Sequence, residues 1–363
     1  MSAHPIFSAV ECRGLQIPSK LVFAPINTGY ASLGRPTQKL VQFHAERSGL
    51  GIGISTVGNV AVDNDAVTNP QTLVLSKEGD ERRFSVVSRA IKKRGSLAGI
   101  QLAFAPAALD PPRNWKAKDV QAEVRRLNMI VGQLSPLQMN TYLETFLKGV
   151  QLANRADFDL IQIHAAHGYL LSLFLNPTTN LRTDEFAASN HWLLDFLGKL
   201  RVATRGLLSF RINLFSGLRP REEEFQLALG LANRLASAGV DVIDLSAGLY
   251  TLDRTLIYPG TLRDERLPYY EAARLMAEDL ACLVAFAGNV RDVRILPLDM
   301  PPNLLVNVGR ALIADPDFAR KSHDGRYTEI NFCTRRNRCH YFTRSRTGLE
   351  CGVNPRLGGK RDE

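Results

Sequence analysis

Short apolar runs recur along the chain, and each is followed by a loop and then by a segment with apolar residues at helical spacing. This alternation is typical of parallel strands joined by crossover helices. We interpret the following runs as strands: Leu21–Pro25, Gly51–Val57, Ala98–Ala103, Leu160–His164, Leu207–Asn213, Val240–Ser246, Leu283–Ala287 and Leu304–Val308. Eight strands with intervening helices over roughly 300 residues favour an α/β fold of the (β/α)8 TIM-barrel type over a doubly wound sheet.

Two helices have clear boundary signals. Ser135, Pro136 and Gln138 supply an N-cap, a first-turn proline and a capping-box partner, so a helix is expected to begin there. It would lead into the fourth strand. A second helix is indicated by an apolar stripe within 225–236, and Gly239 is its expected C-cap.

Three segments lie outside the strand–helix units. Residues 1–20 are expected to form a short β-hairpin that covers one end of the barrel. Residues 104–134, with Trp115 and a proline-rich stretch, are expected to form a long loop at the C-terminal face, where barrel enzymes keep their active sites. The expected organisation is therefore a barrel domain over 1–330 and a basic, cysteine-containing C-terminal extension over 331–363, packed on the barrel or trailing from it.

Composition narrows the class of protein. The chain has 363 residues, 45% of them hydrophobic, but no run approaches the roughly 20 apolar residues of a membrane span and the start lacks a signal sequence. Five cysteines, an odd number, favour a reduced intracellular chain. We therefore expect a cytoplasmic protein without a membrane partner, and a homo-oligomer stays open.

The formal net charge of +9 raises the question of a polyanionic partner. Much of the excess lies within 335–346 and in Arg356, Lys360 and Arg361. We interpret this as a solvated basic tail, so nucleic acid is not the expected partner.

The segment from Ile161 to Phe186 carries the most specific signal. It reads IQIHAAHGYLLSLFLNPTTNLRTDEF and resembles the Old Yellow Enzyme family of flavin-dependent oxidoreductases over more than twenty positions. The resemblance implies bound FMN, NADH or NADPH as electron donor, and a small-molecule electrophile as acceptor. A His-x-x-His pair alone would also be compatible with a structural or metal-binding role, but a zinc site would need a third ligand, and none is suitably spaced nearby.

Flavin-dependent alkene reduction requires hydrogen-bond donors and a proton source, and these residues can supply both. Hydride transfer to an α,β-unsaturated carbonyl places negative charge on the carbonyl oxygen, and His164 and His167 can donate hydrogen bonds to it. The α-carbon then needs a proton, and the hydroxyl of Tyr169 can supply it as a general acid. The alternative is a tyrosine that only packs at the barrel rim.

Other positions resemble the family's cofactor contacts. The phosphate of FMN is expected at Gly288 and Asn289 after the seventh strand and at Gly309 and Arg310 after the eighth. Ring contacts are expected at Pro25, Asn27, Gly58, Gln101 and Arg211. Gln101 would bond the pyrimidine edge, Arg211 would place positive charge near N1 and O2, and Gly58 would let the backbone approach the ring.

Several features depart from the family. Asn27 stands where a threonine or cysteine is common, and the Asn-Thr-Gly run is closer to the dienoyl-CoA reductase branch, which usually carries a four-cysteine iron–sulfur cluster. This chain offers only Cys333, Cys339 and Cys351 after the barrel, so we expect no metal, although a site made from these three and His340 stays open. The alternative enzyme is a flavin dehydrogenase acting on an amine or hydroxy compound. Asn27, together with Ala187 and Ala188 where the family has two glycines, also leaves open a flavin-binding barrel with little turnover.

Overall fold

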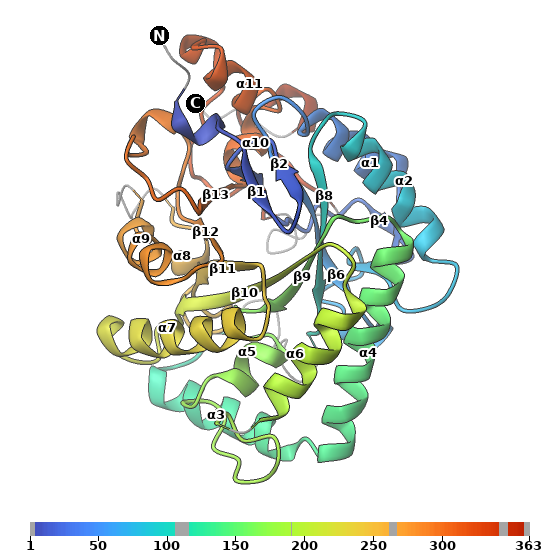
Figure 1. Cartoon of the computed structure of the whole chain (residues 1–363), viewed down its shortest axis with the longest axis vertical. Helices are drawn as coiled ribbons and strands as arrows, with labels where there is room; N and C mark the ends of the chain where they lie inside the picture. The colour runs from blue at the N-terminus through green and yellow to red at the C-terminus, as the bar shows by residue number, and fades with distance from the viewer. Residues whose placement is uncertain (1–3, 106–115, 190, 261–266, 341–347, 359–363) are drawn as a thin grey trace.

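A closed barrel of eight parallel strands forms the centre of the computed structural model, which describes residues 4–105, 116–189, 191–260, 267–340 and 348–358 (Figure 1). Pairing of the first strand with the second and with the last closes the ring. The barrel strands are β3 (Leu21–Phe23), β6 (Ile54–Ala61), β8 (Leu97–Ala103), β9 (Leu160–Ala165), β10 (Leu207–Phe215), β11 (Val242–Ala247), β12 (Leu283–Ala287) and β13 (Leu304–Val308). The eight predicted strands and the TIM-barrel fold are confirmed, although β6 begins and ends later than expected.

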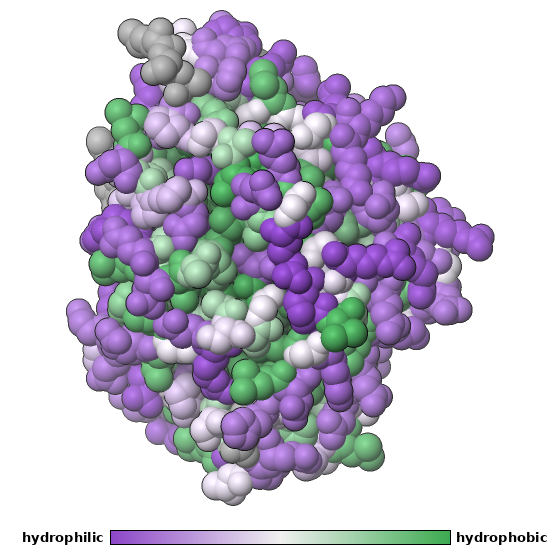
Figure 2. All heavy atoms as spheres, in the orientation of Figure 1, coloured by the Kyte–Doolittle hydropathy of each residue, from purple (hydrophilic) through white to green (hydrophobic). Residues whose placement is uncertain are grey.

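Helices surround the barrel, as α2, α4 and α7 show in Figure 1. The helices are α1 (Gln38–Glu46), α2 (Glu81–Lys92), α3 (Val120–Gln133), α4 (Pro136–Arg155), α5 (Leu170–Leu175), α6 (Trp192–Ala203), α7 (Arg221–Ser237), α8 (Arg254–Ile257), α9 (Tyr270–Asp279), α10 (Arg310–Ala314) and α11 (Phe318–His323). Short strand additions are β4 (Ala31–Ser32), paired with β5 (Arg35–Pro36), and β7 (Leu73–Val74), paired with β6. The molecular face in Figure 2 is mostly hydrophilic, with hydrophobic residues scattered over it. No helix among the described residues has both the length and the apolar character needed to cross a membrane.

The predicted helix boundaries are confirmed. Helix α4 begins at Pro136, and the Ser135 and Gln138 side chains form the reciprocal capping box. Helix α7 ends at Ser237, and Gly239 follows with a φ of 88°, a left-handed conformation that glycine adopts without steric cost.

The N-terminal hairpin closes the bottom of the barrel. Strand β1 (Val10–Cys12) pairs antiparallel with β2 (Leu15–Ile17). Apolar residues of the hairpin pack against residues at the N-terminal ends of the barrel strands, including Val22, Leu160 and Leu207. This apolar layer fills the lower end of the barrel, and the cavity lies at the opposite face. This confirms the predicted hairpin and its place.

The expected long loop over 104–134 is wrong in its second half, which forms α3. Asp119 caps this helix by accepting from the backbone N–H of Ala122, and Leu127 and Val131, four residues apart, are buried. The N-cap and the buried apolar residues favour a helix here, although a proline-rich stretch precedes them in the sequence. Trp115 and the rest of 106–115 lie outside the described residues.

Candidate active site

A cavity of about 350 Å³ lies at the C-terminal ends of the barrel strands, and the loops that follow them form its walls with α3, α8 and residues 333–340. The predicted residues that line it are Pro25, Asn27, Gln101, His164, His167, Tyr169, Arg211, Gly288, Asn289, Gly309 and Arg310. Gly58 is not in the wall. A Cβ on Gly58 would lie 2.9 Å from Cβ of Gln101 and 3.0 Å from Cβ of Pro25, so this glycine lets two lining residues pack together.

Two histidines at the end of β9 form a directed chain of hydrogen bonds. The backbone N–H of Ala166 donates to Nδ1 of His164 over 3.2 Å, so Nε2 carries the proton of the neutral ring. This Nε2 lies 3.3 Å from Nδ1 of His167, whose own Nε2 is 2.7 Å from Oγ of Ser246. His164 therefore donates to His167, and His167 donates to Ser246.

Both imidazoles are held in the neutral form. Burial lowers the pKa of His164 well below its ordinary value, and nearby His167 and Arg211 lower it further. Burial, followed by Arg211, also lowers the pKa of His167 well below its ordinary value. A neutral imidazole keeps one N–H donor, so it can stabilise a developing anion without placing another positive charge in the barrel.

Two tyrosines complete an aromatic group with the histidines. The ring centroid of Tyr169 lies 4.3 Å from that of His164 and 6.2 Å from that of Tyr250. The ring of Tyr250 is in turn 5.8 Å from that of His167. Sequence reasoning missed Tyr250. The available signal was its position three residues after β11, at the face where barrel active sites lie.

Arg211 is fixed below the histidines by residues of β11. Its Nη1 donates to Asp244 over 3.1 Å, and its Nη2 donates to Oγ of Ser246 over 3.1 Å. Asp244 also accepts hydrogen bonds from Gln162 and Asn307, each over 2.8 Å. Burial raises the pKa of the Asp244 carboxyl, whereas Arg211 and the two amide donors act in the opposite direction. Asp244 and Ser246 were not predicted as site residues.

Several buried polar atoms in the cavity wall have no partner in the described part of the chain. They are Nε of Arg211, Nδ2 of Asn59 and Oδ1 of Asn307. A buried polar atom without a partner costs about 1–3 kcal/mol, so a ligand that pairs with it is stabilised. Two donors and one acceptor match the polar edge of an isoalloxazine ring, which carries both carbonyl oxygens and N–H. The wall therefore fits FMN at its ring end.

Arg310 marks the other end of the cavity. Its Nη1 donates to the carbonyl oxygen of Pro259 over 2.6 Å and to Oδ1 of Asn337 over 2.7 Å. Its Nε and Nη2 form no hydrogen bond with the residues that the structure describes. Burial lowers the pKa of the Arg310 guanidinium from its ordinary value. The two available groups can bind a phosphate, and Gly288 and Gly309 line the same region.

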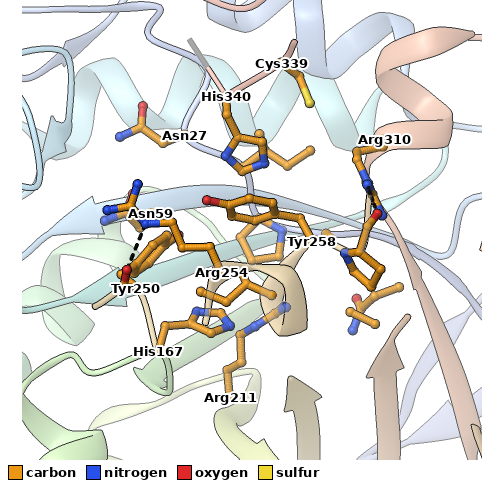
Figure 3. Close-up of a pocket in the computed structure, with 18 of the residues that line it drawn as sticks. Asn27, Asn59, His167, Arg211, Tyr250, Arg254, Tyr258, Arg310, Cys339 and His340 are labelled. Carbon is orange, nitrogen blue, oxygen red and sulfur yellow. Dashed lines mark hydrogen bonds between the residues drawn. The ribbon is translucent and has the colours of Figure 1, made fainter. Parts of the chain in front are cut away.

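The C-terminal extension forms one wall of the cavity. The ring of His340 lies 3.6 Å from that of Tyr258, centroid to centroid, and Nδ2 of Asn337 donates to the carbonyl oxygen of Tyr258 over 3.2 Å. Figure 3 shows the His340 ring next to the Tyr258 ring. Arg335 also lines the cavity, so the interpretation of this stretch as a basic tail is wrong for residues 335–340. These contacts join segments that are far apart in the sequence, so no local sequence pattern predicts them.

The cysteines of the extension are thiols in this structure. Cys333 and Cys339 line the cavity, and burial raises the pKa of Cys339 to about 12, with further increases from Cys333 and Cys351. Within the described ranges, no three His, Cys, Asp or Glu side chains are grouped so that they could hold a metal ion. The expected lack of metal stays a prediction.

Comparison with known proteins places this geometry in a family. The model of the NADH:flavin oxidoreductase / NADH oxidase family matches residues 5–329. The chain is 28% identical to the NADPH dehydrogenase of Bacillus subtilis over 340 residues, 90% of this chain and 97% of that protein. It is also 28% identical to the NADH oxidase of Thermoanaerobacter brockii over 377 residues, 97% of this chain but only 56% of that protein.

Among solved structures, Old Yellow Enzyme from Pichia sp. AKU4542 superposes with a TM-score of 0.67 and 16% identity, covering 89% of this chain and 87% of that one. This likeness supports the barrel fold. The matched family model and the cavity that fits a flavin together identify the family of the chain. The chain belongs to the NADH:flavin oxidoreductase / NADH oxidase family and is an FMN-dependent NAD(P)H oxidoreductase related to Old Yellow Enzyme.

Proposed function

We propose that the protein takes hydride from NADH or NADPH and reduces an α,β-unsaturated carbonyl compound or a related small-molecule electrophile. The observation that carries this proposal is the group formed by His164, His167 and Tyr169 in the cavity above Arg211. It combines neutral hydrogen-bond donors with a phenol, which are the groups that reduction of an activated alkene requires.

The residues that would hold FMN lie along one wall. Arg310, with the backbone at Gly288, Asn289 and Gly309, would bind its phosphate, while Gln101, Asn59, Asn307 and Arg211 would bind the ring edge. When bound, FMN supplies the hydride-transfer chemistry that no side chain of the protein can provide. Arg211 would stabilise negative charge on the ring, because Asp244 and Ser246 fix its guanidinium in place.

The histidines would bind the carbonyl oxygen of the electrophile. Each presents one N–H, and the existing chain through Ser246 fixes which nitrogen carries it. A ligand oxygen would take the place of one acceptor in this chain of hydrogen bonds. It would then accept a hydrogen bond from an imidazole N–H that is already present at neutral pH. Tyr169 would then donate its phenolic proton to the α-carbon, on the side where its ring meets His164.

Asn27 would lie beside the reactive part of the flavin. Its Oδ1 accepts from the backbone N–H of Gly29 over 3.2 Å, and its Nδ2 donates to Oγ1 of Thr72 over 3.3 Å. These bonds fix the orientation of the amide. An amide in place of a hydroxyl or thiol would alter the flavin reduction potential, because the dipole next to the ring differs.

Anaerobic titration tests the proposed function. We expect the flavin-loaded protein to lose its yellow colour with NADH or NADPH and to regain it with cyclohexenone. A protein that stays oxidised with both nicotinamides but is bleached by an amine would instead be a dehydrogenase. A protein that none of these compounds bleaches would be a flavin-binding barrel with little turnover.

A further inference from the structure

A chain of hydrogen bonds between buried side chains crosses the inside of the barrel behind the cavity wall. Nε2 of Gln101 on β8 donates to Oε1 of Gln162 on β9 over 2.7 Å. Nε2 of Gln162 donates to Oδ2 of Asp244 on β11 over 2.8 Å and to Oγ of Ser209 on β10 over 3.1 Å. All four side chains are buried, and of the four only Gln101 lines the cavity.

Asp244 sets the direction of this chain, because an ionised carboxylate can only accept hydrogen bonds. Its Oδ2 accepts from Gln162 and from Nη1 of Arg211, and its Oδ1 accepts from Nδ2 of Asn307. Both carboxylate oxygens therefore face donors. A protonated carboxyl group would have no acceptor for its proton among the described residues, so the ionised form fits this position.

The direction passes from Asp244 to the cavity through two amides. Each amide has one oxygen that accepts and one nitrogen that donates. Nε2 of Gln162 is bonded to Asp244 and Ser209, so its Oε1 faces Gln101, and the Gln101 amide turns its Nε2 away from the cavity. Oε1 of Gln101 has no hydrogen bond within the part of the chain that the structure describes. The cavity wall therefore presents an acceptor here, and a ligand with an N–H group fits it.

We propose that Gln162 and Asp244 are positioning residues that hold the oxygen of the Gln101 amide toward N3–H, the N–H group of the oxidised flavin ring. This inference rests on the proposed function, in which Gln101 lies at the ring edge. Strand pairing supports it, since Gln101 lies directly opposite Gln162, and Arg211 directly opposite Asp244. Without this chain of hydrogen bonds, the Gln101 amide could turn over, and two donors would face each other.

FMN and 3-methyl-FMN, which lacks N3–H, provide a direct test. The full-length protein, freed of flavin, would be titrated with each while flavin fluorescence is followed. We expect the parent to bind FMN about 10-fold or more tightly than 3-methyl-FMN, because the methylated ring leaves the Gln101 oxygen unpaired. Gln162→Met keeps the length of the side chain but removes its polar atoms, so this preference should fall below about threefold. A parent that binds both flavins alike would overturn the inference.

Asp241→Asn is the matched control for changes behind the cavity wall. Asp241 is also buried and forms an ion pair of 2.6 Å with Arg201, but it precedes β11, at the end of the barrel away from the cavity. The preference of this variant for FMN should stay within about twofold of that of the parent. An equal loss of preference in Asp241→Asn and Gln162→Met would show a general loosening of the barrel and would overturn the inference.

A double-mutant cycle separates positioning from packing. If Gln162 acts through Gln101, Gln101→Met should weaken FMN binding about 10-fold, and adding Gln162→Met should change it by less than about twofold. Losses that multiply in the double variant would show that Gln162 supports only the packing of the barrel, which would overturn its assigned role.

The charge of Asp244 gives a second readout. Asp244→Asn removes a negative charge near the ring, so the anionic reduced flavin is stabilised and the flavin reduction potential should rise. Asp241→Asn should leave the potential unchanged, and equilibration with a reference dye measures both. An unchanged potential in Asp244→Asn would overturn the role of its carboxylate. Neither readout uses an alkene, so a parent that prefers FMN but fails to reduce cyclohexenone would contradict the proposed function and leave this inference standing.

Discussion

Ser246 joins the flavin side of the site to the electrophile side. Its Oγ accepts from Nε2 of His167 and from Nη2 of Arg211, so one hydroxyl holds both groups in position. We expect Ser246→Ala to weaken binding of 4-hydroxybenzaldehyde about 10-fold, because the orientation of His167 is no longer fixed. The shift in flavin absorbance on titration measures this.

The neighbouring strand offers a matched control for this serine. Ser209 is also buried in the barrel, but its hydroxyl accepts from Gln162 and has no hydrogen bond to either histidine in the described part of the chain. Ser209→Ala should leave the affinity for the aldehyde within about twofold of the parent. Equal weakening in both variants would show that Ser246 supports only the packing of the barrel.

Tyr169→Phe separates the two halves of the reaction. Flavin reduction by the nicotinamide needs no proton from a phenol, so its rate should stay close to that of the parent. Reoxidation by cyclohexenone should slow by roughly 10²-fold or more, the usual contribution of a placed general acid. Stopped-flow absorbance measures each half, and ferricyanide, which needs no such proton, serves as the control acceptor. If Tyr250→Phe slows the reaction instead, Tyr250 is the acid.

Some residues of the site can be identified from the sequence more readily than others. His164, His167 and Tyr169 belong to one contiguous motif, so a single segment identifies them together. Asp244 and Ser246 lie in an apolar run that reads as a buried strand, and their role depends on partners on other strands. The signal for them was their spacing: polar residues two apart share one face of a strand, here the inside of the barrel.

At the scale of elements, the extension over 333–340 is tied to the barrel through Asn337. Its amide accepts from Arg310 and donates to the carbonyl oxygen of Tyr258. We expect Arg310→Ala to weaken FMN retention about 10-fold or more, because the phosphate loses its charged partner. Asn337→Ala should weaken it less, since Arg310 keeps its bond to Pro259. Equilibrium dialysis of FMN measures both.

The same pair of variants tests where the phosphate lies. If Asn337→Ala weakens FMN binding as much as Arg310→Ala, the arginine acts by holding the extension and the phosphate lies elsewhere. If neither variant loses FMN, both assignments at this end of the cavity are wrong. The outcome therefore separates a phosphate ligand from a structural contact.

At the scale of the whole molecule, the barrel was predictable because its signals are local and repeated. Strands buried on both sides appear as apolar runs, and caps such as Ser135 mark where a helix begins. The position of the extension was not predictable. Asn337 and Tyr258 are 79 residues apart, and nothing in either segment specifies that they meet. The contact depends on the fold of the barrel, which brings the two segments together.

Buried histidines should also make the stability of the whole molecule depend on pH. Burial lowers the pKa of His44 to about 3, and its Nε2 has no hydrogen-bond partner in the described chain to accept an added proton. The folded protein keeps this ring neutral, whereas the unfolded chain takes up a proton below about pH 6.5. Unfolding therefore binds a proton, and stability falls as the pH falls from about 6.5 toward 3.

His44→Gln isolates this effect from the active site. At pH 5 the parent should have lost about 2 kcal/mol through His44, since each pH unit below the unfolded pKa contributes about 1.4 kcal/mol. The variant lacks this contribution, so its free energy of unfolding should fall less between pH 7.5 and pH 5. At pH 7.5 the variant should be less stable than the parent, because His44 packs on Phe23. Urea unfolding at equal FMN loading measures both slopes. His164 and His167 contribute equally to both proteins, so identical slopes would show that folded His44 takes up its proton near pH 6.5 and is not held neutral by burial.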